Sequence, residues 1–445
     1  MTPHPPTAAS SDRQSAVDRF FHLASRGSNH KREFIAGMSM FLATAYAVVT
    51  IPRMLGDAGL PHGAVITCVI VVMALGTASM GLFGNLPMVL APGLGGASLV
   101  AYTLVADGGV PYPVAMGMVF WSGIAFLLLT LFGIRTLITR IIPTPIRLAI
   151  GPAIGIFIAF IGLRQAGLVV AGKKSLEMGD LAAPAALVAV AGTVILLALQ
   201  SRKVPGAFII VIAAITVLGI PLGLTEMSGG PASLPANPGE VAFHIDLLGA
   251  LSPHYLPYLF AFLASEFFAT TGVVMTVTEQ ITEKAPQSAV NITRPFLVDS
   301  CTIVGGSLFG APSVTTYAES TAGAESGGRT GLASLWSALF IALLLFFTPL
   351  ATAIPAAATA PVLVVVGLTM LSRFQRVQAT ELTDVIPAAA VVAFTIYWGN
   401  FGAGIASGLL MYVAAKSLSG RFNQIHPGMW ILTPFLLHFF ASTSL

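Results

Sequence analysis

Residues 84–105 read GNLPMVLAPGLGGASLVAYTLV, and residues 310–328 read GAPSVTTYAESTAGAESGG. Both stretches are apolar segments interrupted by Gly and Pro, and a similar lead-in opens each, Leu82-Phe83-Gly84 in the first and Leu308-Phe309-Gly310 in the second. They lie about half a chain apart. Hydrophobic segments broken at matched positions are typical of internal repeats whose helices unwind near the middle of a membrane. The alternative is that Gly and Pro here only let neighbouring helices approach closely.

The composition places the chain in a membrane. Of its 445 residues, 56% are hydrophobic and only 9% are charged, and the mean hydropathy is +0.87. A soluble domain carries about a quarter charged residues, so a soluble enzyme is excluded. The net charge of +3 comes from scattered residues, which excludes a nucleic-acid partner. Cys68 and Cys301 lie in apolar runs; we expect small core residues and no disulfide or metal site.

Runs long enough to span a membrane, about 20 residues each, occur in both halves. In the first half the candidates lie near 34–52, 63–83, 113–133, 146–163, 181–200 and 205–223. In the second half they lie near 254–278, 290–309, 331–353, 358–372, 385–398 and 400–417. With the two broken segments as third and tenth spans, the chain has fourteen. Seven is an odd number, so the two halves must cross in opposite directions, as an inverted repeat.

The basic residues give the orientation, because Lys and Arg concentrate in cytoplasmic loops. With the N-terminus inside, only four of the 21 fall outside: Arg53, Arg164, Lys173 and Lys174. Both termini are therefore expected in the cytoplasm, and no secretory signal peptide is expected. The predicted parts are a cytoplasmic tail (1–33), a first repeat (34–223), an extracytoplasmic connection (224–253), a second repeat (254–417) and a C-terminal tail (418–445).

Two carboxylates lie inside the predicted spans, Glu266 in LFAFLASEFFATTGVVM and Glu319 at the second break. An acid at the centre of a span costs about 2.5 to 3.5 kcal/mol on insertion scales, so we expect a functional role for both. The structural alternative is a protonated Glu satisfied by nearby backbone. Asp299 and Glu325 lie nearer the ends of their spans, where structural roles are expected, such as a helix cap for Asp299.

Seven short motifs stand out along the chain: Arg32-Glu33-Phe34-Ile35-Ala36-Gly37, Ala45-Tyr46, Leu55-Gly56-Asp57-Ala58-Gly59, Leu90-Ala91-Pro92-Gly93-Leu94-Gly95, Thr270-Thr271-Gly272, Thr315–Gly323 and Gly327–Leu332. Together they resemble the adenine/guanine/hypoxanthine permease branch of the nucleobase-ascorbate transporter (nucleobase:cation symporter) superfamily. The likeness extends over most of the chain, and the last two motifs are specific in combination.

This resemblance implies an all-α polytopic membrane protein of fourteen spans in two inverted repeats of seven. Its third and tenth spans are broken and carry short strand-like segments, and a core domain moves substrate past a gate domain. The implied activity is proton-coupled uptake of a purine base across the inner membrane, without a cofactor and in homodimers. Glu266 and Glu319 match the family's binding carboxylates and are the candidates for proton coupling. The other expected binding residues are Gly95, Gly96, Ala97, Thr270, Thr271, Thr316, Tyr317 and Ala318.

In the mechanism that we expect, Glu266 accepts ring N–H groups. Backbone N–H groups at Gly95–Ala97 and near Tyr317–Glu319 would read the ring's acceptors, and Glu319 would form a second polar wall. Two departures affect the choice of base. Ala97 stands where the family usually has Asn, and Ala269 stands where it usually has a second acid. A lost acceptor in a dry site changes affinity by about 1 to 3 kcal/mol.

Other functions stay open from the sequence alone. A transporter of the same fold can carry another planar heterocycle, such as uracil, xanthine or urate, or a small anion such as sulfate. Two carboxylates near the midplane argue against the anion. A membrane enzyme is disfavoured because the chain has no nucleophile elbow, phosphate loop or intramembrane His-Glu cluster. A channel would conduct without saturation or proton dependence.

Overall fold

Long apolar helices make up most of the chain. The structure is a computed structural model that describes residues 16–133, 141–171, 176–202, 204, 206–225, 230, 232–284, 292–376, 381–397 and 401–442. Residues 1–15 of the predicted tail and the predicted external Lys173 and Lys174 lie outside these ranges, as do the side chains of several residues of α11 (Leu256–Lys284), among them Ala269.

The helices follow the predicted spans closely. In the first half they are α1 (Ala16–Phe21), α2 (His30–Thr44), α3 (Ala47–Asp57), α4 (His62–Ser79), α5 (Leu94–Ser98), α6 (Tyr112–Leu131), α8 (Thr144–Gln165), α9 (Pro184–Ser201) and α10 (Ala207–Gly219). After α11 the second half contains α12 (Thr293–Leu308), α13 (Ser320–Glu325), α14 (Gly331–Leu343), α15 (Thr348–Thr352), α16 (Ala356–Ser372), α17 (Leu382–Tyr397), α18 (Phe401–Leu418) and α19 (Pro427–Ser442).

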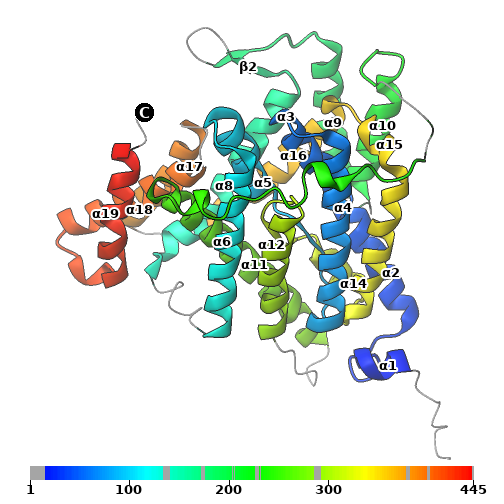
Figure 1. Ribbon diagram of the computed structural model, residues 1–445, viewed down its shortest axis with the longest axis horizontal. Coiled ribbons are helices and arrows are strands. Elements are labelled where there is room, and N and C mark those ends of the chain that lie inside the picture. Colours follow the sequence, from blue (N-terminus) through cyan, green and yellow to red (C-terminus); the bar gives the residue numbers. More distant parts are fainter. Residues whose placement is uncertain are drawn as a thin grey trace, which may run out of the picture.

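Six helical stretches in the described residues are long and apolar enough to cross a membrane: His30–Asp57, His62–Gly84, Tyr112–Leu131, Thr144–Gln165, Pro184–Ser201 and Gly331–Thr352. Five further apolar helices are shorter. The helices run side by side, with α1 at one end of the bundle and β2 (Val169–Ala171) at the other (Figure 1). Strand β2 pairs with β3 (Leu176–Met178) in a hairpin that the hydropathy pattern does not predict.

Both broken segments contain a short strand, as predicted. Strand β1 (Leu90–Pro92) and strand β4 (Val314–Thr316) pair antiparallel, with Leu90 opposite Thr316 and Pro92 opposite Val314. A short helix follows each strand, α5 after β1 and α13 after β4. The fold therefore brings together the two interrupted segments, 84–105 and 310–328.

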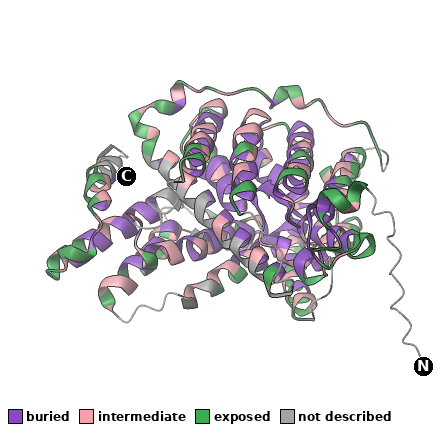
Figure 2. Ribbon diagram, turned by 90° about the horizontal axis from the view of Figure 1, so that it is seen from below, coloured by how far each residue is buried: buried purple, intermediate pink, exposed green. Residues whose placement is uncertain are grey.

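The helices pack in two groups. One group contains α2, α3, α4, α6, α11, α12, α13 and α14, and the other contains α8, α9, α10, α16, α17 and α18. The two groups meet where α11 contacts α8 and α18. The short helix α5, which stands in neither list, also contacts α8. Buried residues line the inner faces of the helices, and exposed residues lie on the outward faces and connections (Figure 2). In a membrane protein the outward faces meet lipid, which is as apolar as a core.

Two sequence expectations are wrong. Asp299 does not cap α12, because it is the seventh residue of that helix, and Ile292 occupies the cap position. Cys301 is exposed on α12, whereas Cys68 is buried as expected. Hydropathy cannot separate a lipid-facing position from a core position, since both are apolar.

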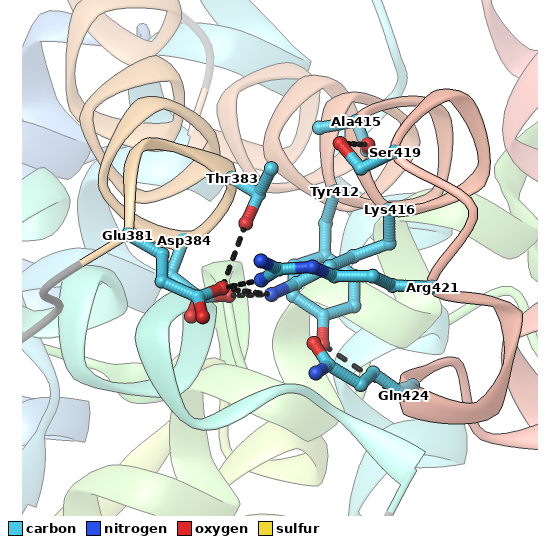
Figure 3. A network of polar contacts seen from close by, with 9 residues as sticks. All are labelled: Glu381, Thr383, Asp384, Tyr412, Ala415, Lys416, Ser419, Arg421 and Gln424. Carbon is cyan, nitrogen blue, oxygen red and sulfur yellow. Dashed lines mark hydrogen bonds and ion pairs between the residues drawn. The ribbon is translucent and has the colours of Figure 1, made fainter.

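A polar cluster joins α17 and α18 away from the broken segments (Figure 3). The Lys416 ammonium lies 2.9 Å from Asp384 Oδ1 and 3.3 Å from Glu381 Oε2, and Arg421 also donates to Glu381. Hydrogen bonding from Lys416 lowers the pKa of Glu381 below its usual range. Lys416 is buried, and two carboxylates compensate its charge. The cluster therefore holds the start of α17 against the end of α18.

Candidate functional site

The paired strands β1 and β4 form the centre of the candidate site. Two further bonds extend the ladder, from the Gly93 N–H to the Ser313 carbonyl (2.8 Å) and from the Tyr317 N–H to the Val89 carbonyl (2.9 Å). Backbone that leaves a helix inside a membrane must find partners within the protein, because lipid offers none. Each break thus satisfies the other, and neither half could form this arrangement alone.

Asp299 links β4 to helices α11 and α12. Its side chain is fully buried, and Oδ1 accepts hydrogen bonds from the N–H (2.9 Å) and the hydroxyl (2.8 Å) of Thr316. Oδ2 accepts from the Thr270 hydroxyl (2.7 Å), whose oxygen also lies 2.7 Å from Thr315 Oγ1. One carboxylate on α12 therefore holds both the strand and α11 in register.

Glu266 on α11 faces the first break and is only 2% exposed. Its Oε1 accepts a hydrogen bond from the Ser313 hydroxyl. Its Oε2 has no hydrogen-bond partner among the described residues. A methyl group built on Gly96 would lie 3.3 Å from Oε1, and one on Gly93 would lie 3.6 Å away. A buried acceptor without a partner costs about 1 to 3 kcal/mol, so Oε2 is a prime candidate for a ligand contact.

Glu319 lies at the start of α13 and is half-buried. Its Oε1 accepts a hydrogen bond from the Tyr46 hydroxyl, which joins α2 and α3 to the second break at 2.7 Å. The Tyr317 hydroxyl donates to the Pro92 carbonyl at 2.6 Å, and its ring lies 6.4 Å from that of Tyr46. Tyr317 interacts electrostatically with both Glu266 and Glu319. The two acids therefore lie near the same tyrosine.

The predicted site residues lie close to the strand pair, but several are already engaged. The hydroxyls of Thr270 and Thr316 bond Asp299, and the Tyr317 N–H bonds Val89. Thr271 and Ala318 are half-buried. These contacts give the threonines a role in holding the site together.

The first break contributes mainly backbone. Ala97 is buried, and its N–H donates to the Gly93 carbonyl (2.8 Å), so this N–H is not available to read a ligand as the sequence analysis expected. Gly95 packs on the second helix group, since a methyl built there would lie 2.8 Å from Ile154 Cγ2 on α8. At the first break, Gly95 and Gly96 therefore form the wall of the site.

Sequence reasoning missed Ser313 and the role of Asp299. Ser313 has a left-handed backbone (φ +56°) directly before β4, and such a conformation is rare outside Gly. The run Ala311-Pro312-Ser313 carried a turn signal, but hydropathy alone could not show that its hydroxyl reaches Glu266. The sequence favours a cap for Asp299 because its strand partner Thr316 lies 17 residues further along, beyond the end of α12.

Two cavities elsewhere are apolar. One of about 430 Å³ lies between α4 and α12 beside Gly76, Cys301 and Thr302. One of about 200 Å³ lies among α8, α9 and α16 beside Leu163 and Val364. Neither is lined by Glu266 or Glu319. The carboxylates of the candidate site therefore lie at the breaks, outside these two cavities.

Residues 31–407 match the profile of the permease family of the xanthine/uracil type. The chain belongs to the xanthine/uracil permease family. It is a multi-pass membrane transporter and not an enzyme, and the family resemblance seen in its motifs is confirmed.

Relatives of known name match this permease nearly end to end. Adenine permease AdeP of Escherichia coli is 34% identical over 418 residues, which cover 93% of each chain. Guanine/hypoxanthine permease PbuO of Bacillus subtilis is 34% identical over 415 residues, 92% of this chain and 96% of that one. Guanine/hypoxanthine permease GhxP of Escherichia coli O157:H7 is 31% identical over 437 residues, 96% of this chain and 97% of that one.

Solved transporters share the permease's fold at lower identity. The transmembrane domain of the cyanobacterial bicarbonate transporter BicA superposes with a TM-score of 0.60 at 18% identity and covers 83% of this chain and 96% of its own. SLC26A9 gives 0.59 at 12% identity, with 89% of this chain and 67% of its own covered. At such identities the likeness concerns the fold and not the substrate.

Proposed function

We propose that this permease is a secondary active transporter that takes up a purine nucleobase together with protons. The observation that carries the proposal is Oε2 of Glu266, an acceptor without a partner among the described residues, buried where the two breaks pair. A nucleobase supplies the ring N–H that such an acceptor needs. The names of the relatives AdeP, PbuO and GhxP support the purine class.

In the proposed complex each wall of the site recognises a different part of the base. Glu266 Oε2 accepts a ring N–H, and the N–H groups of Gly95 and Gly96 face the ring's carbonyl and nitrogen acceptors. Glu319, oriented by Tyr46, forms the second polar wall, with Thr271, Ala318 and Tyr317 beside it. Protonation of Glu266 or Glu319 couples the cycle to the proton gradient, since a neutral acid is far cheaper to carry through a membrane than a charged one.

We further propose the membrane arrangement. Counting α2 with α3 as one span and each strand with its short helix as another, the helices supply fourteen spans with both termini cytoplasmic. The group that contains α11 and α12 is the core that carries the site, and the group that contains α8 and α16 is the gate. Homodimers in the inner membrane complete the arrangement.

An anion is a weaker candidate. Two carboxylates beside the strand pair would repel a bound anion unless both were protonated. The anion and bicarbonate transporters that share the fold are too distant in sequence to carry their substrates over to this chain.

The test is uptake of radiolabelled hypoxanthine, guanine, adenine, xanthine, uracil and sulfate by proteoliposomes with an imposed inward proton gradient. We expect saturable purine uptake that a protonophore abolishes, and a rise in KM of about 10- to 100-fold in Glu266→Gln, the effect of losing a hydrogen bond to a charged group. Glu240→Gln, an exposed acid in a connection, is the matched control. Gradient-driven uptake that Glu266→Gln leaves unchanged would refute the proposal.

A further inference from the structure

Ser313 links the two breaks to Glu266 through both its backbone and its side chain. It is fully buried and directly precedes β4. Its carbonyl accepts from the Gly93 N–H at 2.8 Å, and its hydroxyl donates to Glu266 Oε1. The left-handed φ of +56° turns the chain so that both groups face the first break. Ser313 therefore fixes one specific oxygen of the carboxylate.

The first break encloses that oxygen. A methyl group on Gly96 would lie 2.1 Å from Ser313 Oγ, which no real contact allows, and 3.3 Å from Oε1 of Glu266. A methyl on Gly93 would lie 3.6 Å from the same oxygen. Oε1 is thus bonded by a hydroxyl and walled by two glycines, whereas Oε2 has no partner among the described residues.

This asymmetry matters for ring recognition. A carboxylate with both oxygens open can receive two parallel N–H donors in a fork. Guanine presents such a pair, its N1–H and its 2-amino group, on one edge. Hypoxanthine is the same ring without the 2-amino group and presents N1–H alone. A carboxylate that offers one oxygen suits the single donor and gives the extra amino group no acceptor.

Building on the nucleobase transport proposed above, we infer that Ser313 is a specificity-determining positioning residue. By occupying one acceptor site of Glu266 Oε1, close to Gly93 and Gly96, it leaves Oε2 as the more accessible acceptor and favours a base with one N–H on the recognised edge, of the hypoxanthine type, over a guanine-type base. Gly96 belongs to the same device, because only a residue without a side chain leaves room for the Ser313 hydroxyl.

The experiment compares KM for guanine with KM for hypoxanthine in proteoliposomes. In the wild-type protein we expect guanine to have the higher KM. In Ser313→Ala the guanine-to-hypoxanthine ratio should fall about tenfold, the factor that one ordinary hydrogen bond carries. A purely structural role would raise both KM values together and leave their ratio unchanged, and that result would overturn the inference.

Further variants guard against misfolding and cross-check the geometry. Ser313→Gly suits the left-handed backbone and should lower the ratio as Ser313→Ala does. Gly96→Ala would place a methyl group 2.1 Å from Ser313 Oγ and 2.2 Å from Ser313 Cβ, so it displaces the hydroxyl and the same direction is expected. Ser320→Ala, which removes a buried hydroxyl that accepts from Val89 N–H, is the control that should leave the ratio unaltered.

The outcomes separate the two proposals. Failure of the wild-type protein to transport any nucleobase would overturn the proposed function and the inference with it. Hypoxanthine and guanine uptake with a ratio that neither Ser313 nor Gly96 variants move would overturn the inference alone and leave the proposed function in place.

Discussion

The two broken segments share a backbone plan but differ in chemistry. Residues 84–105 contain no Asp, Glu, His, Lys or Arg, whereas residues 310–328 contain Glu319 and Glu325 and a run of hydroxyl side chains. In the paired structure the first break offers glycine backbone, and the second offers side chains that bond Glu266 and Asp299. The repeat thus duplicates the way the helix is broken, while the polar side chains described above come from the second half.

The first break is also stabilised by hydrogen bonds from its backbone to side chains outside it. The Leu90 N–H donates to Thr77 on α4 (3.0 Å), the Val89 N–H to Ser320 on α13 (3.0 Å) and the Met88 N–H to Ser334 on α14 (2.8 Å). At β4 of the second break, by contrast, one carboxylate, Asp299, accepts hydrogen bonds from the N–H and the hydroxyl of Thr316 and from the hydroxyl of Thr270. This difference predicts that the second break is the more vulnerable to one substitution.

The largest effect is expected for Asp299→Ala. It leaves the Thr316 N–H and the Thr270 hydroxyl without their acceptor, at about 1 to 3 kcal/mol for each buried group. We expect a marked fall in melting temperature in detergent and loss of uptake, with a milder effect for Asp299→Asn, which keeps a carbonyl oxygen. Ser300→Ala is the control, because its hydroxyl bonds only carbonyls of its own helix. A variant Asp299→Ala that melts and transports like the wild type would end the claim of vulnerability.

Much of this comparison was accessible from the sequence. The break positions, the strand-like Val314–Thr316 and the inward placement of Glu266 follow from hydropathy, β-branched residues and the cost of a buried charge. The functions of Ser313 and Asp299 were not accessible, because each depends on a contact across 17 to 47 residues of chain whose geometry only the paired strands fix. That Oε2 of Glu266 has no hydrogen-bond partner within the described part of the chain is likewise a property of packing and not of any motif.

An intermediate effect is expected at the Tyr46–Glu319 hydrogen bond, which tests whether the second break also supplies the second polar wall. Tyr46→Phe and Glu319→Gln should each raise KM for the transported base by up to about tenfold. Tyr46→Phe removes the donor of the 2.7 Å contact, and Glu319→Gln replaces its charged acceptor with a neutral amide oxygen. Because both act on one contact, the double variant should be no worse than the more severe single one. Tyr412→Phe, whose hydroxyl bonds Gln424 far from the breaks, serves as the control. Additive effects would show that the two residues act separately.

The smallest effect on transport is expected in the first break. Thr77→Val keeps the shape of the side chain but removes the hydroxyl that bonds the N–H and the carbonyl of Leu90. We expect a loss of about 1 to 3 kcal/mol in stability, with KM unchanged within about twofold, since this break presents only backbone to the ligand. Thr67→Val on the same helix is the matched control, because its hydroxyl bonds only the Gly63 carbonyl one turn earlier. A large change in KM for Thr77→Val, with stability intact, would mean that the side chains supporting the first break also determine substrate affinity, and the contrast between the two halves would fail.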